Sequence, residues 1–306
     1  MNIRDDILSL GEKTVFALRR LYKDCGYSQY KMSKFEEYDL YAGNKNFLVS
    51  DNIITFTDTD GKLMALKPDV TLSIIKSSRP EKGGVEKVFY DENVYRVSKG
   101  THAYKEIMQA GLECIGDITD IDILEVLTLA AKSLEAISGD YMIEISHAGI
   151  ISKIFDDMNI SDIAKGRLLK CIGEKNIHEA LTICAENGLD SYRLIKLMKL
   201  CGSPKEIIPV LEADFADMGG NELCGIIKAL CESVPSERIH IDFSVLNDMN
   251  YYNGIVFKGY INGIPTGILS GGQYGSLARK MGKSCEAIGF AVYLDELEDL
   301  GGADNE

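Results

Sequence analysis

The sequence predicts an α+β fold in which helices pack on a mainly antiparallel β-sheet. The first observation is the order of the predicted elements, which runs helix, β-hairpins, helix, a long helical stretch, a β-meander and a last short element. The second is that most predicted strands follow one another directly along the chain, which favours antiparallel pairing. The third is that 45% of the 306 residues are hydrophobic, enough to build a sizeable core.

The first 66 residues predict a helix followed by a β-hairpin. Apolar residues recur at helical spacing between positions 7 and 25, and Gly26 can end that helix. Residues 31–41 are mixed in character and are expected to be extended. Residues 53–57 are a β-rich run, and a turn at 58–61 separates them from the apolar residues 63–66. We therefore expect residues 53–66 to form a hairpin.

The segment Lys67-Pro68-Asp69-Val70-Thr71 links this hairpin to a helix. Pro68 has no backbone N–H and ends the strand pairing, so Asp69 or Thr71 can cap the helix that starts near Leu72. The alternative is that the carboxylate and the hydroxyl face a ligand amine. Residue type alone favours capping, because Asp and Thr are common at helix starts.

Residues 90–117 predict a second, longer hairpin with a polar inner face. Its first strand centres on residues 94–96, its loop spans 98–104, and its second strand alternates between two faces. One face carries Ile107, Gln109, Gly111 and Glu113, and the other carries Met108, Ala110, Leu112 and Cys114. The apolar set can face a core. Gln109 and Glu113 lie about 13–14 Å apart on an ideal strand, which suits a small ligand held at two ends.

The remaining chain divides into a helical segment and a return to strands. A helix is expected over 119–139 and a strand over 141–146, and residues 150–236 read as helix after helix. Strands return at 238–245, 255–257 and 263–269, with a strand or a helix start at 287–291. We therefore expect a core formed by 1–149 and 237–306, interrupted by a helical insertion at 150–236.

Composition excludes several classes of function. Thirty-three Lys and Arg against 47 Asp and Glu give a net charge of −14, which disfavours nucleic-acid binding. No apolar run of 18 residues and no secretory signal is found, so a cytoplasmic protein without a membrane span is expected. The eight cysteines form no CxxC pair, and His240 has no second ligand nearby in the sequence. We therefore expect free thiols, no metal site and no cofactor.

Five motifs in order carry a resemblance to a known family. They are residues 66–71 (LKPDVT), 94–113 with Arg96 and QAGLE, 247–252 (NDMNYY), 271–274 (GGQY) and 287–291 (AIGFA). Together they resemble the catalytic core of class II histidyl-tRNA synthetases and, more closely, their non-catalytic paralogue, the regulatory subunit of ATP phosphoribosyltransferase. The resemblance covers nearly the whole chain. It implies the class II synthetase fold, an antiparallel sheet flanked by helices.

Departures from the synthetase pattern fall at the nucleotide-handling positions. Glu296 stands where the family has the arginine that holds the nucleotide, and Asn247 replaces the arginine that serves amino-acid activation. Neither side chain supplies a fixed positive charge. Ser98 replaces the acidic partner of the motif 2 arginine, and Ser33 replaces the motif 1 proline. The chain stops soon after motif 3, so we expect no anticodon-binding domain, no tRNA binding and no synthetase activity.

The resemblance also implies a histidine pocket without catalytic residues. In it the α-ammonium group meets Asp69, Thr71 and Gln109. The imidazole meets Glu113 and Tyr251 or Tyr252, and Arg96 holds the carboxylate. Acceptors for an ammonium, a cation for a carboxylate and an acid for a ring N–H suit this amino acid.

The function implied is that of a regulatory subunit. Such a subunit activates the short-form ATP phosphoribosyltransferase, mediates histidine feedback inhibition of the first step of histidine synthesis, and forms homodimers and a hetero-octamer with the catalytic chain. Two alternatives remain. One is a working histidyl-tRNA synthetase core with its anticodon domain on another chain, and the other is a histidine-binding regulator of a different enzyme.

Overall fold

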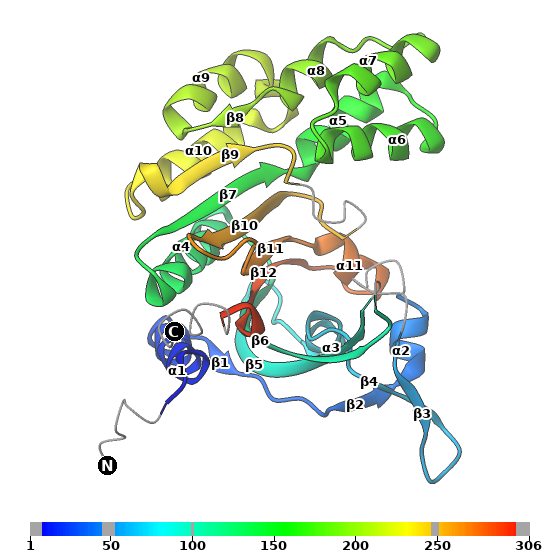
Figure 1. Ribbon diagram of the computed structural model, residues 1–306, viewed down its shortest axis with the longest axis vertical. Coiled ribbons are helices and arrows are strands. Elements are labelled where there is room, and N and C mark those ends of the chain that lie inside the picture. Colours follow the sequence, from blue (N-terminus) through cyan, green and yellow to red (C-terminus); the bar gives the residue numbers. More distant parts are fainter. Residues whose placement is uncertain (1–7, 45–52, 99–100, 246–250, 298–306) are drawn as a thin grey trace.

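The long central hairpin organises the fold. The computed structural model describes residues 8–44, 53–98, 101–245 and 251–297. Strands β5 (Val85–Val97) and β6 (Tyr104–Gly116) pair antiparallel along their whole lengths, as predicted. They belong to a nine-stranded sheet in the order β1-β5-β6-β12-β11-β10-β7-β9-β8 (Figure 1). The other strands are β1 (Ser28–Gln29), β7 (Tyr141–His147), β8 (Cys201–Gly202), β9 (Ile239–Asp242), β10 (Ile255–Ile261), β11 (Leu269–Gln273) and β12 (Glu286–Tyr293).

The predicted α+β fold is confirmed, with two parallel pairs added to an antiparallel centre. Every pair from β5 through β6, β12, β11 and β10 to β7 is antiparallel. By contrast, β1 pairs parallel with β5, and β7 pairs parallel with β9. A parallel neighbour requires a long crossover connection. The whole stretch 148–238 supplies that crossover between β7 and β9.

One face of the sheet is covered by helices α1 (Leu10–Asp24) and α4 (Asp120–Ile137). Ser9 and Glu12 form a capping box at the start of α1, so this helix begins three residues later than the spacing predicts. Tyr22 of α1 is fully buried, and its ring centroid lies 5.9 Å from that of Phe89 and 6.0 Å from that of Phe290. The apolar set Ala110, Leu112 and Cys114 belongs to this core, which confirms the predicted alternation of β6.

A second apolar cluster lies on the opposite face. It gathers residues of α2 (Tyr38–Ala42), α3 (Thr71–Ser77), α11 (Gly275–Lys280) and the sheet, including Tyr90 and Ile115. The predicted hairpin is confirmed as β3 (Thr55–Thr57) and β4 (Leu63–Leu66). The stretch expected to be extended, 31–41, instead gives a short strand, β2 (Phe35–Glu37), followed by α2. These three strands form a separate small sheet beside α3 (Figure 1).

The stretch 148–238 is mainly helical. It contains α5 (Ala148–Met158), α6 (Asp162–Gly173), α7 (Ile177–Glu186), α8 (Tyr192–Met198), α9 (Pro204–Asp214), α10 (Gly220–Leu230) and the short turns η3 (Ala216–Met218) and η4 (Ser236–Arg238). The two-residue strand β8 escapes prediction because so short a run has no periodicity. It returns to the main sheet by pairing with β9.

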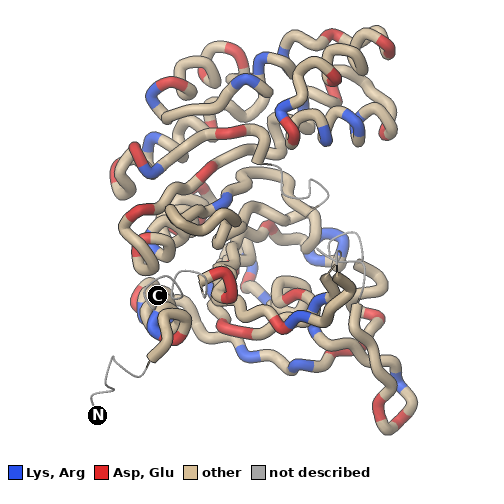
Figure 2. Tube along the Cα trace, in the orientation of Figure 1, with Lys and Arg blue, Asp and Glu red and all other residues tan. Residues whose placement is uncertain are grey.

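Charges of both signs alternate along these helices, as Figure 2 shows. Ion pairs join neighbouring helices, with Arg167–Glu179 at 2.9 Å and Lys196–Asp214 at 2.6 Å. Such exposed pairs each contribute about 0–1 kcal/mol. Within the described part of the chain, no helix is both long and apolar enough to cross a bilayer.

Candidate functional site

Glu113 is the centre of the candidate site. Its side chain is only 2% exposed. One carboxylate oxygen accepts a hydrogen bond from Thr71 Oγ1 at 2.7 Å, and the other accepts one from the Tyr274 hydroxyl. Thr71 is the first residue of α3, and Tyr274 directly follows β11. Three segments far apart in the sequence therefore meet at one buried carboxyl group.

Gly289 makes room for this carboxyl group. It lies directly opposite Glu113 in the β12–β6 register. A Cβ atom built at Gly289 would collide with the Glu113 carboxylate and with the Leu112 carbonyl oxygen. Any larger residue would force the carboxyl group or the backbone to move.

The surroundings of Glu113 bring the pKa of its carboxyl group close to neutral pH. Burial raises the pKa of its carboxyl group to about 8, and the charge of Asp69 acts in the same direction. The hydrogen bonds from Tyr274 and Thr71 act the other way, because they stabilise the carboxylate form. The group can accept or release a proton near pH 8, so its charge is sensitive to whatever binds beside it.

Asp69 and Arg96 lie together at the start of α3. Asp69 Oδ1 accepts a hydrogen bond from the Leu72 backbone N–H at 2.9 Å, so the predicted helix-capping role is confirmed for Asp69. Arg96 Nε donates to the Pro68 carbonyl oxygen at 3.0 Å. Burial raises the pKa of Asp69, while the Leu72 N–H and the Arg96 charge counteract it. Thr71 bonds Glu113 rather than the helix end.

Aromatic rings form one wall of the site. The ring centroids of Tyr251 and Tyr252 are 4.7 Å apart, and those of Tyr251 and Tyr274 are 5.6 Å apart. Burial, together with the charges of Asp69 and Glu113, raises the pKa of Tyr251 and Tyr252 well above the usual 10. Their hydroxyl groups therefore stay protonated and can donate hydrogen bonds.

The remaining predicted residue, Gln109, is 4% exposed and sits opposite Tyr293 in the β12–β6 register. It shares a strand face with Glu113, since the residues between them alternate into the opposite core. The structure adds two residues that sequence reasoning did not assign to the site, Tyr274 and Tyr293. Burial raises the pKa of Tyr293, with Arg96 lowering it and Asp69 raising it further. Only the GGQY motif pointed toward Tyr274.

Comparison with known proteins places this chain in a family. A family model described as Histidyl-tRNA synthetase matches residues 9–297. An ATP phosphoribosyltransferase regulatory subunit from Clostridium kluyveri is 30% identical over 293 residues, which is 91% of this chain and 74% of that relative. The chain belongs to the histidyl-tRNA synthetase family, among its ATP phosphoribosyltransferase regulatory subunits. A regulatory subunit from Oceanobacillus iheyensis is 28% identical over 285 residues, covering 90% and 70% of the two chains.

Solved structures show the same fold. The chain superposes with a TM-score of 0.81 on a structure described as an ATP phosphoribosyltransferase regulatory subunit/histidyl-tRNA synthetase from Bacillus halodurans, at 24% identity, covering 97% of this chain and 82% of the other. It superposes with a TM-score of 0.73 on a chain of the ATP phosphoribosyl transferase complex from Thermotoga maritima, at 21% identity, covering 93% and 97%. The class II synthetase fold predicted from the motifs is therefore confirmed.

This member of the family carries an acidic turn after β12. Glu296 lies in the short helix η5 (Leu294–Leu297) and accepts a hydrogen bond from Thr266 Oγ1 at 2.6 Å. Asp295 beside it accepts one from the Met108 backbone N–H at 2.9 Å. The turn thus holds carboxylates at the position where the resemblance to the synthetases implies an arginine. Asn247, the other departure, lies outside the described residues.

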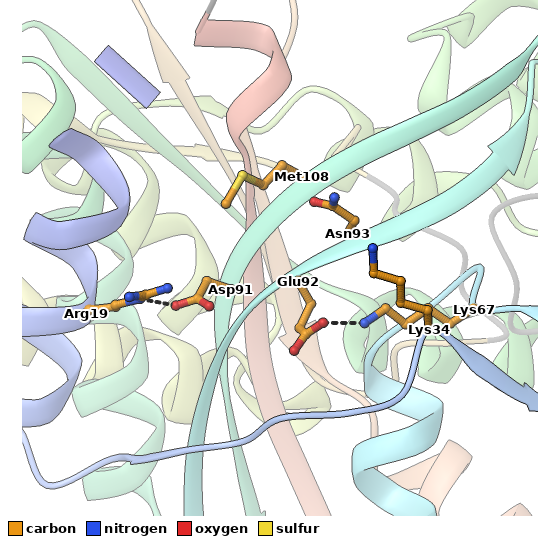
Figure 3. A pocket seen from close by; sticks show the side chains of 7 residues that line it. All are labelled: Arg19, Lys34, Lys67, Asp91, Glu92, Asn93 and Met108. Atoms are coloured by element: carbon orange, nitrogen blue, oxygen red, sulfur yellow. Dashed lines mark hydrogen bonds and ion pairs between the residues drawn. The ribbon is translucent and has the colours of Figure 1, made fainter. Parts of the chain in front are cut away.

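A cavity of about 250 Å³ lies on β5 near α1, and none of the predicted site residues lines it. Its walls are Arg19, Lys34, Lys67, Asp91, Glu92, Asn93 and Met108 (Figure 3). Two ion pairs, Arg19–Asp91 and Lys67–Glu92, lie among the residues that line it. The Lys67 side chain is fully buried, so its ammonium group depends on Glu92 as a partner, and the pair links the end of β4 to β5. Both pairs join residues of the chain to one another and identify no ligand for the cavity.

Proposed function

We propose that this chain is the non-catalytic regulatory subunit of an ATP phosphoribosyltransferase and that it senses histidine at the Glu113 site. The observation that carries the proposal is Glu113, a buried carboxyl group that meets Thr71, Tyr274 and a wall of tyrosine rings. Membership in the regulatory-subunit family supports the role. The protein would act in the cytoplasm, in the first step of histidine synthesis.

Histidine fits the chemistry of these side chains. A ring N–H can donate to Glu113, and the rings of Tyr251 and Tyr252 can pack against the imidazole. The α-carboxylate can pair with Arg96. In our proposal the α-ammonium group meets the Asp69 carboxylate, whose Oδ1 caps α3. Gln109 and Thr71 are proposed as further ammonium contacts.

The proposed partner is the short-form catalytic subunit. The Thermotoga maritima structure that shares this fold is described as an ATP phosphoribosyl transferase complex, which supports a hetero-oligomer. We further propose that the chain forms homodimers and, with the catalytic subunit, a hetero-octamer. Light scattering of the chain alone and of the mixture tests both steps, and a monomer that ignores the catalytic subunit contradicts them.

We also propose that synthetase chemistry has been lost. The carboxylate of Glu296 would repel a triphosphate, and Asn247 provides no positive charge for a developing phosphate. The purified chain should show no histidine-dependent exchange of pyrophosphate into ATP. The rival function, a working histidyl-tRNA synthetase core, is favoured by the description of the matching family model. Exchange activity that copurifies with the chain through repeated purification would establish that rival.

The decisive experiment measures activation and inhibition separately. The catalytic subunit is assayed alone, with this chain, and with the Glu113→Ala variant across a range of histidine concentrations. Loss of one buried hydrogen-bond partner costs about 1–3 kcal/mol, so the variant should still activate but bind histidine about 5- to 150-fold more weakly. Asp69→Ala should also weaken binding, but it should discriminate histidine from its ring analogues as well as the wild type does.

Each outcome addresses a different part of the proposal. If the chain fails to activate the catalytic subunit, the regulatory assignment is wrong. If activation is normal but Glu113→Ala is inhibited at the same histidine concentration as the wild type, histidine binds elsewhere. Calorimetry of the isolated chain with histidine separates a binding defect from an assembly defect.

A further inference from the structure

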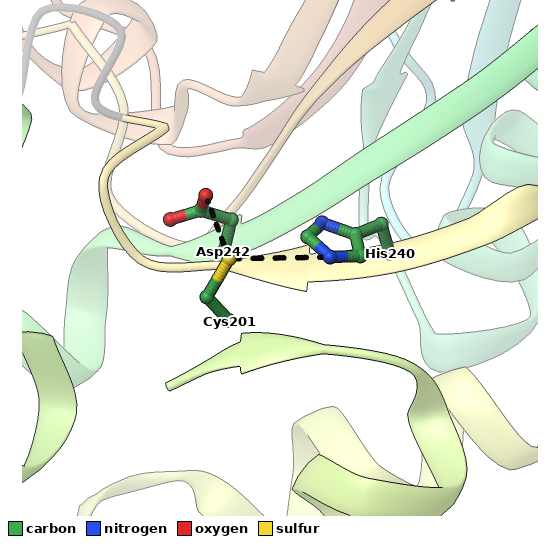
Figure 4. A group of neighbouring side chains, drawn as sticks. All are labelled: Cys201, His240 and Asp242. Carbon is green, nitrogen blue, oxygen red and sulfur yellow. Dashed lines mark hydrogen bonds between the residues drawn. The ribbon is translucent and has the colours of Figure 1, made fainter. Parts of the chain in front are cut away.

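Three potential metal ligands from two neighbouring strands meet at the edge of the main sheet. Cys201 lies on β8 and pairs directly opposite Asp242 of β9, while His240 precedes Asp242 by two residues. Opposite partners and residues two apart share a sheet face, so all three side chains project to one side (Figure 4). Sequence spacing argued against a ligand role for His240, but the crossover 148–238 delivers Cys201 beside it.

The donor atoms lie close to the spacing that a tetrahedral metal ion requires. Cys201 Sγ lies 3.4 Å from Asp242 Oδ2 and 3.9 Å from His240 Nε2, and all three donors lie within 4.8 Å of one another. Metal–ligand bonds of Zn²⁺ at tetrahedral angles would place such donors about 3.3–3.6 Å apart. A metal ion at this site would therefore draw the His240 ring toward Cys201 Sγ and Asp242 Oδ2. Cys201 is exposed, which gives an ion access from solvent.

A second observation points to the same site from the far side of the imidazole. His240 Nδ1 is buried and has no hydrogen-bond partner among the described residues. The nearest carboxylate oxygen recorded beside it is Glu144 Oε1, at 3.6 Å. A metal ion on Nε2 would fix the proton on Nδ1, which could then donate to Glu144. That carboxylate–histidine–metal relay is the usual support of a histidine ligand.

The position between the donors already attracts a cation. The Lys175 ammonium donates to Asp242 Oδ2 at 2.6 Å and to Cys201 Sγ at 3.4 Å. Its side chain is 46% exposed, so it can turn into solvent. Two carboxylates, Asp242 and Glu144, outnumber this single positive charge. A divalent ion with a softer preference for sulfur can therefore replace the ammonium group.

We propose that Cys201, His240 and Asp242 bind a divalent metal ion of the Zn²⁺ class in exchange for the Lys175 ammonium. Binding converts the Cys201 thiol to a metal-bound thiolate and releases its proton to solvent, while Lys175 keeps its own proton. The fourth position is open to water. The ion would fasten β8 to β9 and thereby fix the helical stretch 148–238 to the sheet. This site is independent of the Glu113 pocket.

The test uses the full-length chain treated with a chelator and then titrated with Zn²⁺ by calorimetry in the presence of a competing chelator. The wild type should bind one equivalent. Co²⁺ should give a thiolate-to-metal charge-transfer band that Cys201→Ala removes. Cys201→Ala and His240→Ala should each lose more than the roughly 10- to 100-fold expected for Glu144→Gln. The matched controls Cys25→Ala and His178→Ala replace residues away from the site and should bind as the wild type does.

A substitution of Lys175 should strengthen metal binding, whereas the ligand substitutions weaken it. The backbone of Lys175 is left-handed, with φ of 52°, so Lys175→Gly is tolerated by the turn after α6. Removing the competing ammonium should tighten Zn²⁺ binding. Because the buried Asp242 carboxylate loses its ion-pair partner, the metal-free variant should be less thermally stable than the wild type and should regain stability when Zn²⁺ is added. The proposal is overturned if the wild type binds no stoichiometric Zn²⁺, if Cys201→Ala binds it unchanged, or if the Co²⁺ complex lacks the thiolate band.

Discussion

Replacing Glu113 with glutamine should remove a pH dependence of stability that the wild type carries. Burial raises the pKa of this carboxyl group from an ordinary 4.5 to about 8 in the folded chain. Between these values the folded state holds a proton that the unfolded state releases. Stability therefore falls as pH rises, by about 1.4 kcal/mol per pH unit, and levels off above the folded pKa. The whole interval amounts to a loss on the order of 4–5 kcal/mol.

Glutamine is the suitable replacement because it keeps the shape and most of the hydrogen bonds. Its amide oxygen can accept from the Thr71 hydroxyl, and its NH₂ group can donate to the Tyr274 oxygen once that hydroxyl turns away. The variant cannot ionise, so it avoids burying a charge at high pH. It should be more stable than the wild type at pH 9 and show little advantage near pH 5.

Urea unfolding followed by circular dichroism at several pH values provides the measurement. From pH 6 to pH 8 the wild type should lose about 2–3 kcal/mol more than Glu113→Gln does. Glu135→Gln, which changes an exposed acid of α4, is the matched control and should follow the wild-type curve. Parallel pH profiles for the wild type and Glu113→Gln would show that the buried carboxyl group is not protonated in the folded state, and the reasoning would fail.

Two further predictions follow from buried groups and close packing. His147 caps α5 by accepting a hydrogen bond from the Ile150 N–H at 3.2 Å, and burial lowers its pKa to about 4. As pH falls, the unfolded state therefore takes up a proton before the folded state does, and about 3 kcal/mol of the free energy of unfolding is lost between pH 6.5 and pH 4. His147→Asn keeps a capping side chain but cannot titrate in this range. In urea unfolding, this variant should lose less stability than the wild type over the same pH interval. Gly289→Ala should lower stability by about 1–3 kcal/mol and weaken histidine binding, because its Cβ collides with Glu113. Unchanged histidine affinity in a folded Gly289→Ala variant would place the ligand away from this carboxyl group.

Local patterns in the sequence predict the elements but not which of them become neighbours. The alternation of β6 and the hairpin of β3 and β4 follow from period-two patterning and turn residues, and both are confirmed. Asp69 could be predicted as a cap because a capping bond spans only three residues. The contact between Tyr274 and Glu113 spans 161 positions and depends on β12 pairing with both β6 and β11. No local sequence pattern predicts that pairing of strands.

The same reason explains why no metal-ligand partner for His240 can be predicted from the sequence. The cysteine that lies beside it, Cys201, is 39 positions away in the sequence, and the two-residue strand that carries Cys201 has no detectable pattern. The parallel pair of β7 and β9 creates the edge to which β8 then adds. Ligand spacing in a sequence identifies metal sites built within one motif, whereas a site assembled across a crossover requires the fold.

The geometry also keeps the proposed amino-acid site apart from the acidic turn after β12. Glu113 lies between α3, the end of β11 and Gly289, which has no side chain. The pairing of the strands therefore determines what surrounds its carboxyl group. Glu296 lies beyond the end of β12, in a turn tied to Thr266 rather than to the site. A change of charge at position 296 therefore leaves the hydrogen bonds of Glu113 intact. Under the proposed function, a regulatory subunit can in this way carry Glu296 in place of the synthetase arginine and keep a pocket for the amino acid that it would report.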